Sequence, residues 1–83
     1  MNMPKPRSET GEKNLIATRL IALRKRDGLS QRDLSIRLQL AGMNMDKNVI
    51  TRIETQKRYV ADMEIKALAA VFSVSYGYLI DGV

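Results

Sequence analysis

The sequence predicts an all-α domain of five short helices, and three observations support this fold class. Apolar residues recur at intervals of three and four along most of the chain, as on the buried face of a helix. No segment alternates with the period of two that marks a half-buried strand. Capping residues and glycines separate the periodic stretches. We expect residues 1–10 to be a flexible tail and residues 11–83 to be one compact domain.

Composition narrows the classes of function. The 83 residues include neither Cys nor His, which removes disulfides, thiolate metal sites and the commonest general base. We therefore expect no enzyme, no metal and no cofactor. The 14 Lys and Arg residues against 9 Asp and Glu give a net charge of +5, which suits nucleic acid but also an ordinary basic surface. Neither a membrane span nor a secretory signal is evident, so we expect a cytoplasmic protein.

The first helix is expected from Gly11 to Asp27. Cations crowd its C-terminal half, where they suit the helix dipole. Gly28 follows and can take the left-handed conformation that ends a helix. In the preceding tail, Lys5 and Arg7 could contact phosphates, although a solvated terminus is favoured. The predicted buried stripe of this helix is Ile16, Leu20 and Leu23, widened by Leu15 and Ala22.

Two short helices joined by a turn follow, over Leu29–Glu54. Ser30 is a good N-cap for the first of them, with Asp33 completing a capping box, and this helix closes near Gly42. The turn, Gly-Met-Asn-Met, is unusually apolar. Asp46 is expected to cap the second helix, which runs to Glu54. The predicted core residues of the pair are Leu34, Leu38, Ile50 and Ile53.

The second helix of the pair has a polar outer face that gives a short helix little stability. Its residues can therefore be chosen for a partner rather than for folding. The four outer residues are Lys47, Asn48, Thr51 and Arg52.

Two more helices are predicted before the end of the chain. Asp62 is the expected N-cap of the fourth helix, and Ser75 is the expected N-cap of the fifth. The buried stripe of the fourth helix is Ile65, Leu68, Ala69 and Phe72. An apolar cluster then ends the sequence and consists of Tyr76, Tyr78, Ile80 and Val83.

Three stretches together resemble the lambda-repressor-like helix-turn-helix domains of the Xre/Cro/C1 type. They read IALRKRDGLSQRDLS, VITRIE and DMEIKALAAVFSVSYGYLIDG. The similarity covers roughly residues 14–82 and rests on the order of the motifs, because no single tripeptide is diagnostic. It implies a five-helix DNA-binding domain whose third helix reads the major groove of double-stranded DNA.

The resemblance implies roles for the outer polar residues. Asn48 can bond adenine, and Lys47 or Arg52 can donate to guanine, while Thr51 can contact a base edge or a thymine methyl. Asp46 is explained by capping alone. Two groups of residues are expected to contact the phosphates of the DNA backbone. The group at the start of the second helix is Ser30, Gln31 and Arg32. The group after the third helix is Lys57, Arg58 and Tyr59.

The sequence departs from the family pattern at two places. The interval from Leu34 to Glu54 is longer than usual by about one helical turn and a residue, which implies an extended turn between the second and third helices. Gln56 stands where the family usually has Gly. A left-handed conformation costs a non-glycine residue on the order of 1 kcal/mol. We therefore expect the backbone at Gln56 to follow another path.

Two structural roles also follow from the resemblance. Arg24 and Glu54 match an ion pair that joins the first helix to the end of the third. The C-terminal apolar cluster either completes the core or forms the interface of a homodimer, and the dimer is favoured.

The leading interpretation is a sequence-specific transcriptional regulator, most simply a repressor. The alternative is an antitoxin-like or other protein-interaction module that binds DNA only weakly. An enzyme is a poor third, because the only close acidic pair, Asp62 and Glu64, is explained by helix capping.

Overall fold

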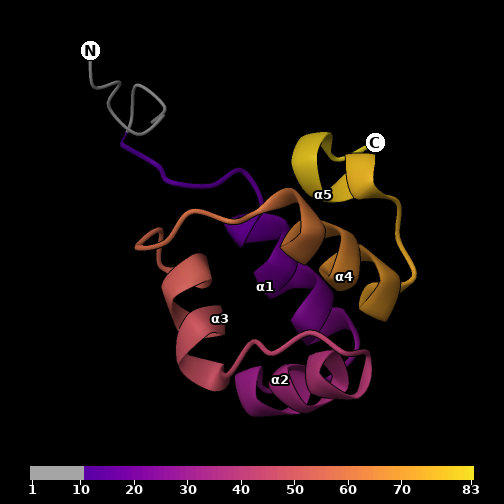
Figure 1. Ribbon diagram of the computed structural model, residues 1–83. Coiled ribbons are helices and arrows are strands. Elements are labelled where there is room, and N and C mark those ends of the chain that lie inside the picture. Colours follow the sequence, from indigo (N-terminus) through magenta and orange to yellow (C-terminus); the bar gives the residue numbers. More distant parts are fainter. Residues whose placement is uncertain (1–10) are drawn as a thin grey trace.

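The computed structural model describes residues 11–83, and all regular secondary structure in this range is helical. The predicted all-α fold class with five helices is therefore confirmed. In the view of Figure 1, α1 runs through the middle of the molecule, α2 lies below it, α3 lies to the left and α5 lies at the upper right. The helices are α1 (Ala17–Arg26), α2 (Gln31–Leu40), α3 (Lys47–Glu54), α4 (Asp62–Phe72) and α5 (Tyr76–Asp81).

The first helix is shorter than predicted, because it begins at Ala17 and not at Gly11. The side chain of Asn14 explains the start. Its Oδ1 accepts hydrogen bonds from the backbone N–H groups of Ile16 at 3.1 Å and Ala17 at 2.9 Å. An Asn side chain that satisfies these donors favours a helix start at this point over continued helix before it. Residues 11–16 therefore form a non-helical segment that leads into α1.

The end of α1 follows the prediction for Gly28, which has a φ of 66°. The backbone N–H of Leu29 donates to the carbonyl of Arg24 at 2.8 Å, and that of Gly28 donates to Lys25 at 3.2 Å. This pair of bonds is the Schellman motif, which satisfies the last carbonyl groups of a helix. It also turns the chain sharply, so that α2 can begin at Gln31.

A complete capping box starts α2, as predicted. Ser30 Oγ accepts from the Asp33 N–H at 2.9 Å, and the Asp33 carboxylate accepts from the Ser30 N–H at 3.0 Å. The bond from the Ser30 N–H, followed by the bond from its hydroxyl, lowers the pKa of Asp33. The helix ends at Leu40, and Gly42 follows two residues later with a φ of 87°.

The extended connection between α2 and α3 covers residues 41–46, and burial accounts for its apolar composition. Met45 is 2% exposed and belongs to the core, and Met43 packs partly against that core. Asp46 then caps α3 as predicted, because its Oδ1 accepts from the Val49 N–H at 2.9 Å. The long turn is therefore an anchored segment that fixes where α3 begins.

The start of α4 differs from the prediction. Ala61 occupies the N-cap position, and Asp62 is the first residue of the helix. Glu64 takes over the capping role, because its Oε1 accepts from the Ala61 N–H at 3.0 Å. The predicted cap of α5 is confirmed, since Ser75 Oγ accepts from the Tyr78 N–H at 3.0 Å.

One hydrophobic cluster holds all five helices together. It contains all four core residues that the sequence predicts for α2 and α3, and all four of the α4 stripe. Two residues of the predicted α1 stripe lie outside it, because Leu15 is 60% exposed and Ala22 is also exposed. The fully buried large side chains are Phe72, Ile16, Leu20, Leu34, Leu38, Met45, Ile50, Ile53, Leu68 and Leu79.

The predicted flexible tail, residues 1–10, lies outside the described residues, as do Lys5 and Arg7. Within residues 11–83, no helix is long and apolar enough to cross a lipid bilayer.

Candidate nucleic-acid interface

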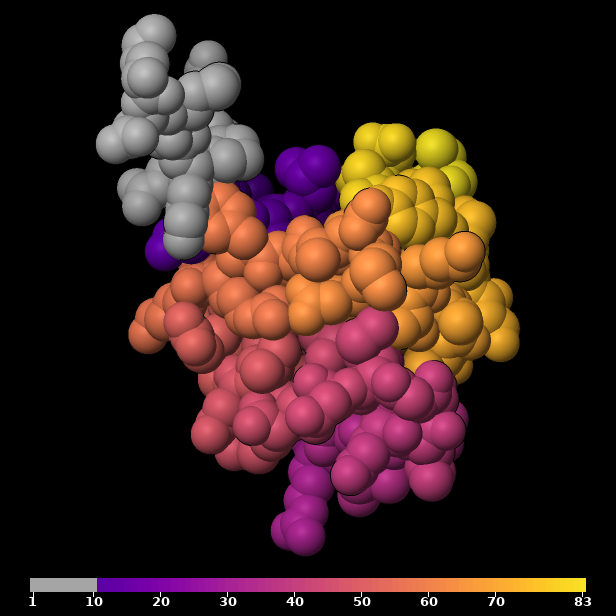
Figure 2. Space-filling model, in the orientation of Figure 1, coloured from indigo at the N-terminus to yellow at the C-terminus, as the bar shows by residue number. Residues whose placement is uncertain are grey.

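The outer face of α3 exposes three of the four side chains that the sequence predicts as base readers. Lys47, Asn48 and Arg52 are exposed, whereas Ile50 and Ile53 on the opposite face are fully buried. Within residues 11–83, the three polar side chains make no hydrogen bond and no ion pair. Figure 2 shows α3 and the connection that follows it on the left flank of the molecule. This face can therefore bind a partner without breaking an internal contact.

Thr51 occupies a different environment from the other three predicted readers. Its side chain is half-buried between α2 and α3. Its Oγ1 lies 2.8 Å from Gln31 Oε1 and 2.9 Å from the Lys47 carbonyl oxygen. A hydroxyl has one proton, so it donates to one of these two acceptors at a time. Thr51 thus connects α3 to the start of α2.

Gln31 and Glu54 extend this contact into a polar network that joins three helices. Gln31 Nε2 donates to Glu54 Oε1 at 3.0 Å. The guanidinium of Arg24, on α1, donates from Nε and Nη2 to the two oxygens of Glu54 at 2.7 and 2.8 Å. Its third contact is to the Leu29 carbonyl at 3.0 Å. The Gln31 side chain, predicted to contact a phosphate, is therefore held toward α3 by internal bonds.

The pair between Arg24 and Glu54 is almost completely shielded from solvent. The Glu54 side chain is 4% exposed and that of Arg24 is 15% exposed. The hydrogen bonds to Glu54 raise the pKa of Arg24 against the opposing effect of burial. A bidentate pair of this kind has a defined geometry as well as charge attraction. It fixes the last residue of α3 on α1 and on the turn that precedes α2.

The start of α2 presents a second group of predicted contacts. Ser30 and Arg32 are exposed, and the Arg32 side chain makes no hydrogen bond or ion pair within the described range. The N-terminus of a helix carries unpaired N–H groups and a partial positive charge, which suit a phosphate. The capping carboxylate of Asp33 lies at the same end and offsets part of that charge.

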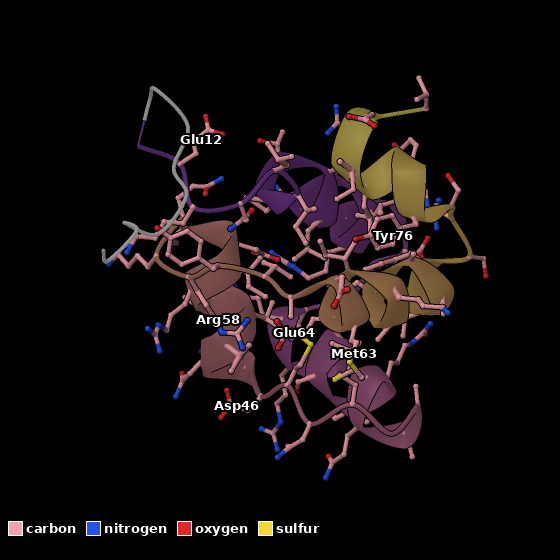
Figure 3. The ribbon with its side chains drawn as sticks, turned by 45° about the horizontal axis from the view of Figure 1, so that its top comes forward. Glu12, Asp46, Arg58, Met63, Glu64 and Tyr76 are labelled. Carbon is pink, nitrogen blue, oxygen red and sulfur yellow. The ribbon has the colours of Figure 1, made fainter. Side chains whose placement is uncertain are left out.

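The three predicted phosphate contacts after α3 lie in unlike environments. Lys57 is exposed, with no side-chain partner in the described part of the chain. Arg58 instead donates to both oxygens of Glu64 at 2.9 and 2.8 Å and to the Tyr59 carbonyl at 3.1 Å. Figure 3 shows Arg58 and Glu64 pointing toward one another. Tyr59 is half-buried, and the Lys13 ammonium lies 5.8 Å from the centre of its ring.

The bonds between Arg58 and Glu64 change the acidity of both groups. They raise the pKa of Arg58 and lower that of Glu64. The side chains are 28% and 16% exposed, so this pair is intermediate between a surface pair and a buried one. The pair shapes the connection between α3 and α4. Lys57 is then the cation of this connection whose side chain has no partner among residues 11–83.

Gln56 and Asn14, to which the sequence analysis gave no site role, also hold this region together. Gln56 keeps the left-handed conformation, with a φ of 62°, so the expectation of another backbone path is wrong. Its side-chain amide bonds the backbone of Lys13 and Asn14, and the side chain of Asn14 bonds the Ile53 and Arg58 carbonyls. A Gln at a position that favours Gly was the signal available in the sequence.

The C-terminal apolar cluster is divided between the core and the surface. Tyr78 and Ile80 pack partly against the core, whereas Tyr76 is 43% exposed and Val83 is 87% exposed. Figure 3 shows Tyr76 beside α5 and well apart from Asp46 at the start of α3. A partner bound at the α5 surface would therefore leave the outer face of α3 accessible.

The acidic side chains of the domain do not gather into a metal site. Among residues 11–83, no group of three or more His, Cys, Asp or Glu residues could hold a metal ion. Glu64, the acidic residue nearest to Asp62 in the sequence, is engaged by Arg58 and by the α4 N-terminus.

These contacts define an all-α domain in which a partly buried polar network and one core hold α3 with its polar face outward. The structure is similar to the crystal structure of a hypothetical transcription factor, NHTF, from Neisseria, with a TM-score of 0.71 and 21% sequence identity. The similarity covers 96% of this chain and 85% of that chain, and it establishes a shared fold. No protein-family model matches the sequence, and no curated protein matches it either.

Proposed function

We propose that this protein is a sequence-specific transcriptional regulator that inserts α3 into the major groove of double-stranded DNA. The observation that carries the proposal is the contrast between the two faces of α3. Ile50 and Ile53 are fully buried, whereas Lys47, Asn48 and Arg52 are exposed with no partner among residues 11–83. A helix fixed by one face and unpartnered on the other can dock without rearrangement. The fold shared with a hypothetical transcription factor supports the same reading.

Base recognition is assigned to the N-terminal half of α3 and to Arg52. Asn48 has the amide that bonds adenine N6 and N7, and Lys47 and Arg52 have donors for guanine O6 and N7. Thr51 is half-buried, so we assign it mainly to a methyl contact with thymine, its hydroxyl remaining bonded inside the protein.

Phosphate contacts are assigned to both ends of the helix pair. Ser30, Gln31 and Arg32 would hold one phosphate at the start of α2, where unpaired N–H groups meet an exposed guanidinium. Lys57 would hold a flanking phosphate after α3. Arg58 and Tyr59 contribute less, since Glu64 already neutralises the Arg58 charge and Tyr59 is half-buried.

The proposal includes a homodimer that represses transcription. The exposed Tyr76 and Val83, with Tyr78 and Ile80 behind them, would form a self-complementary interface on α5. The two copies of α3 would then read two half-sites about one helical turn apart. The simplest consequence of such binding is that other proteins are blocked from the same DNA.

Selection of bound sequences from a random DNA pool tests this function. We expect enrichment of a palindromic site with two half-sites. Recovery of unenriched sequences would contradict the proposal and would favour the protein-interaction module, which binds DNA weakly and without sequence preference.

A further inference from the structure

Two non-glycine residues within residues 11–83 have a positive φ, namely Gln56 at 62° and Ser73 at 55°. Each follows a helix, and the backbone bonds around them match. The Gln56 N–H donates to Ile53 at 3.2 Å and the next N–H donates to Arg52 at 2.8 Å. The Ser73 N–H donates to Ala70 at 3.2 Å and the next N–H donates to Ala69 at 3.0 Å. Both are Schellman ends, where glycine is the usual residue.

The two residues differ in what their side chains do. Ser73 is exposed, and its side chain makes no hydrogen bond within the described range. Gln56 Oε1 accepts from the backbone N–H groups of Lys13 at 2.9 Å and Asn14 at 3.0 Å. Gln56 Nε2 donates to the carbonyl of Asn14 at 3.1 Å. The side chain thus binds a backbone segment 42 residues earlier in the chain.

Asn14 completes the connection from the other side. Its Nδ2 donates to the carbonyls of Ile53 at 3.0 Å and Arg58 at 3.1 Å, the first being at the end of α3 and the second in the connection that follows. Its Oδ1 accepts from the first N–H groups of α1. One amide side chain therefore joins the start of α1 to the end of α3.

We propose that Gln56 and Asn14 form a latch that positions α3 for DNA, and that Gln56 is retained at a strained position because its side chain closes this latch. The inference rests on the proposed DNA-binding function. Neither residue is assigned a contact with DNA. Both act through the C-terminal end of α3, which they hold against α1 beside the Arg24–Glu54 pair. Recognition groups must be held within about 0.5 Å of their productive geometry, so loosening this end weakens binding.

The matched substitutions Gln56→Gly and Ser73→Gly test the latch itself. Both relieve a left-handed conformation, but only Gln56→Gly removes side-chain hydrogen bonds. Amide hydrogen exchange, measured by NMR at equal pH, reports the N–H groups of Lys13 and Asn14 directly. We expect exchange at these two amides to be at least tenfold faster in Gln56→Gly and to change less than tenfold in Ser73→Gly. A smaller change in Gln56→Gly, or unprotected amides in the wild type, overturns the proposal.

The substitution Gln56→Asn separates the effect of side-chain length from the effect of backbone strain. Asn tolerates the left-handed conformation, but its side chain is one methylene shorter than that of Gln. We expect it to accelerate exchange at Lys13 and Asn14 at least tenfold, as Gln56→Gly does. Wild-type protection in Gln56→Asn would contradict the latch.

DNA titrations over a range of salt concentrations distinguish positioning from direct contact. We expect Gln56→Gly to weaken binding to the selected DNA at least fivefold without changing the slope of log K against log salt. Lys57→Ala should reduce the steepness of that slope by about 0.9, since one phosphate contact is lost. A Gln56→Gly variant with wild-type affinity, or with the slope of Lys57→Ala, overturns the positioning role. Wild-type protein that binds no DNA overturns the proposed function instead, and hydrogen exchange still decides whether the latch exists.

Discussion

At the scale of single residues, the side chains around α3 divide into those with internal partners and those without. Arg24 on α1 and Gln31 on α2 both donate to Glu54 on α3, whereas Lys47 and Asn48 have no side-chain partner among residues 11–83. Burial follows the same division, because the Glu54 side chain is 4% exposed while Lys47 and Asn48, two of the predicted readers, are exposed. The first group holds the helix, and the second is accessible to a ligand.

Glu54→Ala should destabilise the fold strongly and weaken DNA binding as a consequence. It leaves the largely buried Arg24 guanidinium without its carboxylate, and removing one partner of a buried pair costs about 3–5 kcal/mol. Chemical denaturation measures the free energy of unfolding. Asp27→Ala is the control, because it breaks the exposed Arg26–Asp27 pair, worth about 0–1 kcal/mol. Full wild-type stability in Glu54→Ala would show that the pair has no structural role.

The Arg58–Glu64 pair should make the free energy of unfolding depend on pH. The pKa of Glu64 is lowered in the folded protein by its bonds to Arg58, relative to an ordinary value of 4.5. A carboxyl group whose pKa is lowered in the folded protein stabilises the fold at pH values above its ordinary pKa. This stabilisation is lost as the pH falls through the pKa of the folded state. Thermal melts of wild type and Glu64→Gln should therefore differ most near pH 7 and converge toward pH 3. A difference that is constant across this range would contradict the assignment.

At the scale of helices and turns, the extended connection between α2 and α3 is anchored by one side chain. Met45 is 2% exposed in this connection and directly precedes the cap of α3. Its burial links the apolar turn in the sequence to the position of α3. The extra residues of this connection therefore position α3 by packing Met45 into the core, and not only by lengthening the chain between α2 and α3.

Met45→Ala should cost about 2–5 kcal/mol of unfolding free energy, because it leaves a cavity in the core. Met63→Ala is the matched control, since Met63 is 71% exposed, and it should leave stability within about 0.5 kcal/mol of wild type. Denaturant midpoints compare the two variants directly. Equal midpoints would mean that Met45 does not anchor the connection.

Periodicity and capping chemistry predicted most elements of the fold. The caps at Ser30, Asp46 and Ser75 are confirmed, because each side chain alone can satisfy a local N–H group. The predicted start of α1 at Gly11 was wrong. Asn14 caps the N–H groups of Ile16 and Ala17, and its side chain is held in place by the distant carbonyls of Ile53 and Arg58, which local periodicity does not reveal. The cap of α4 was misplaced by one residue because Glu64 reaches back from inside the helix.

The candidate site was less predictable than the fold, because its key contacts join residues far apart in the sequence. Periodicity identified the outer face of α3, and the family resemblance suggested Arg24 and Glu54. Neither could show that Gln31 bonds Glu54, or that Arg58 is engaged by Glu64. Those contacts depend on how whole helices pack, which local patterns do not encode.

At the scale of the whole molecule, the proposed dimer surface and the proposed DNA surface are separated. Figure 3 shows Tyr76 beside α5 and well apart from Asp46 at the start of α3, so we expect that both surfaces can be occupied together. A specific interface usually buries about 1,200–2,000 Å² in total, which requires more of the α5 surface than Tyr76 and Val83 alone.

Sedimentation of the protein at micromolar concentration should show a dimer. Tyr76→Asp should weaken association at least tenfold, because it places a charge at the proposed interface. Leu40→Asp is the control, because Leu40 is 84% exposed on α2 and lies outside that surface. A wild type that sediments only as monomer, or equal effects of the two substitutions, would contradict the α5 interface.

The most direct test of the account compares affinity for the selected DNA with affinity for the same sequence scrambled, by fluorescence anisotropy at fixed salt. We predict that wild-type protein prefers the selected DNA by at least about 1,000-fold. Lys47→Ala and Asn48→Ala should each lose about 1–3 kcal/mol of this preference, while Lys66→Ala, an exposed lysine on α4, should keep it. Equal wild-type affinity for the two DNAs would contradict base reading by α3.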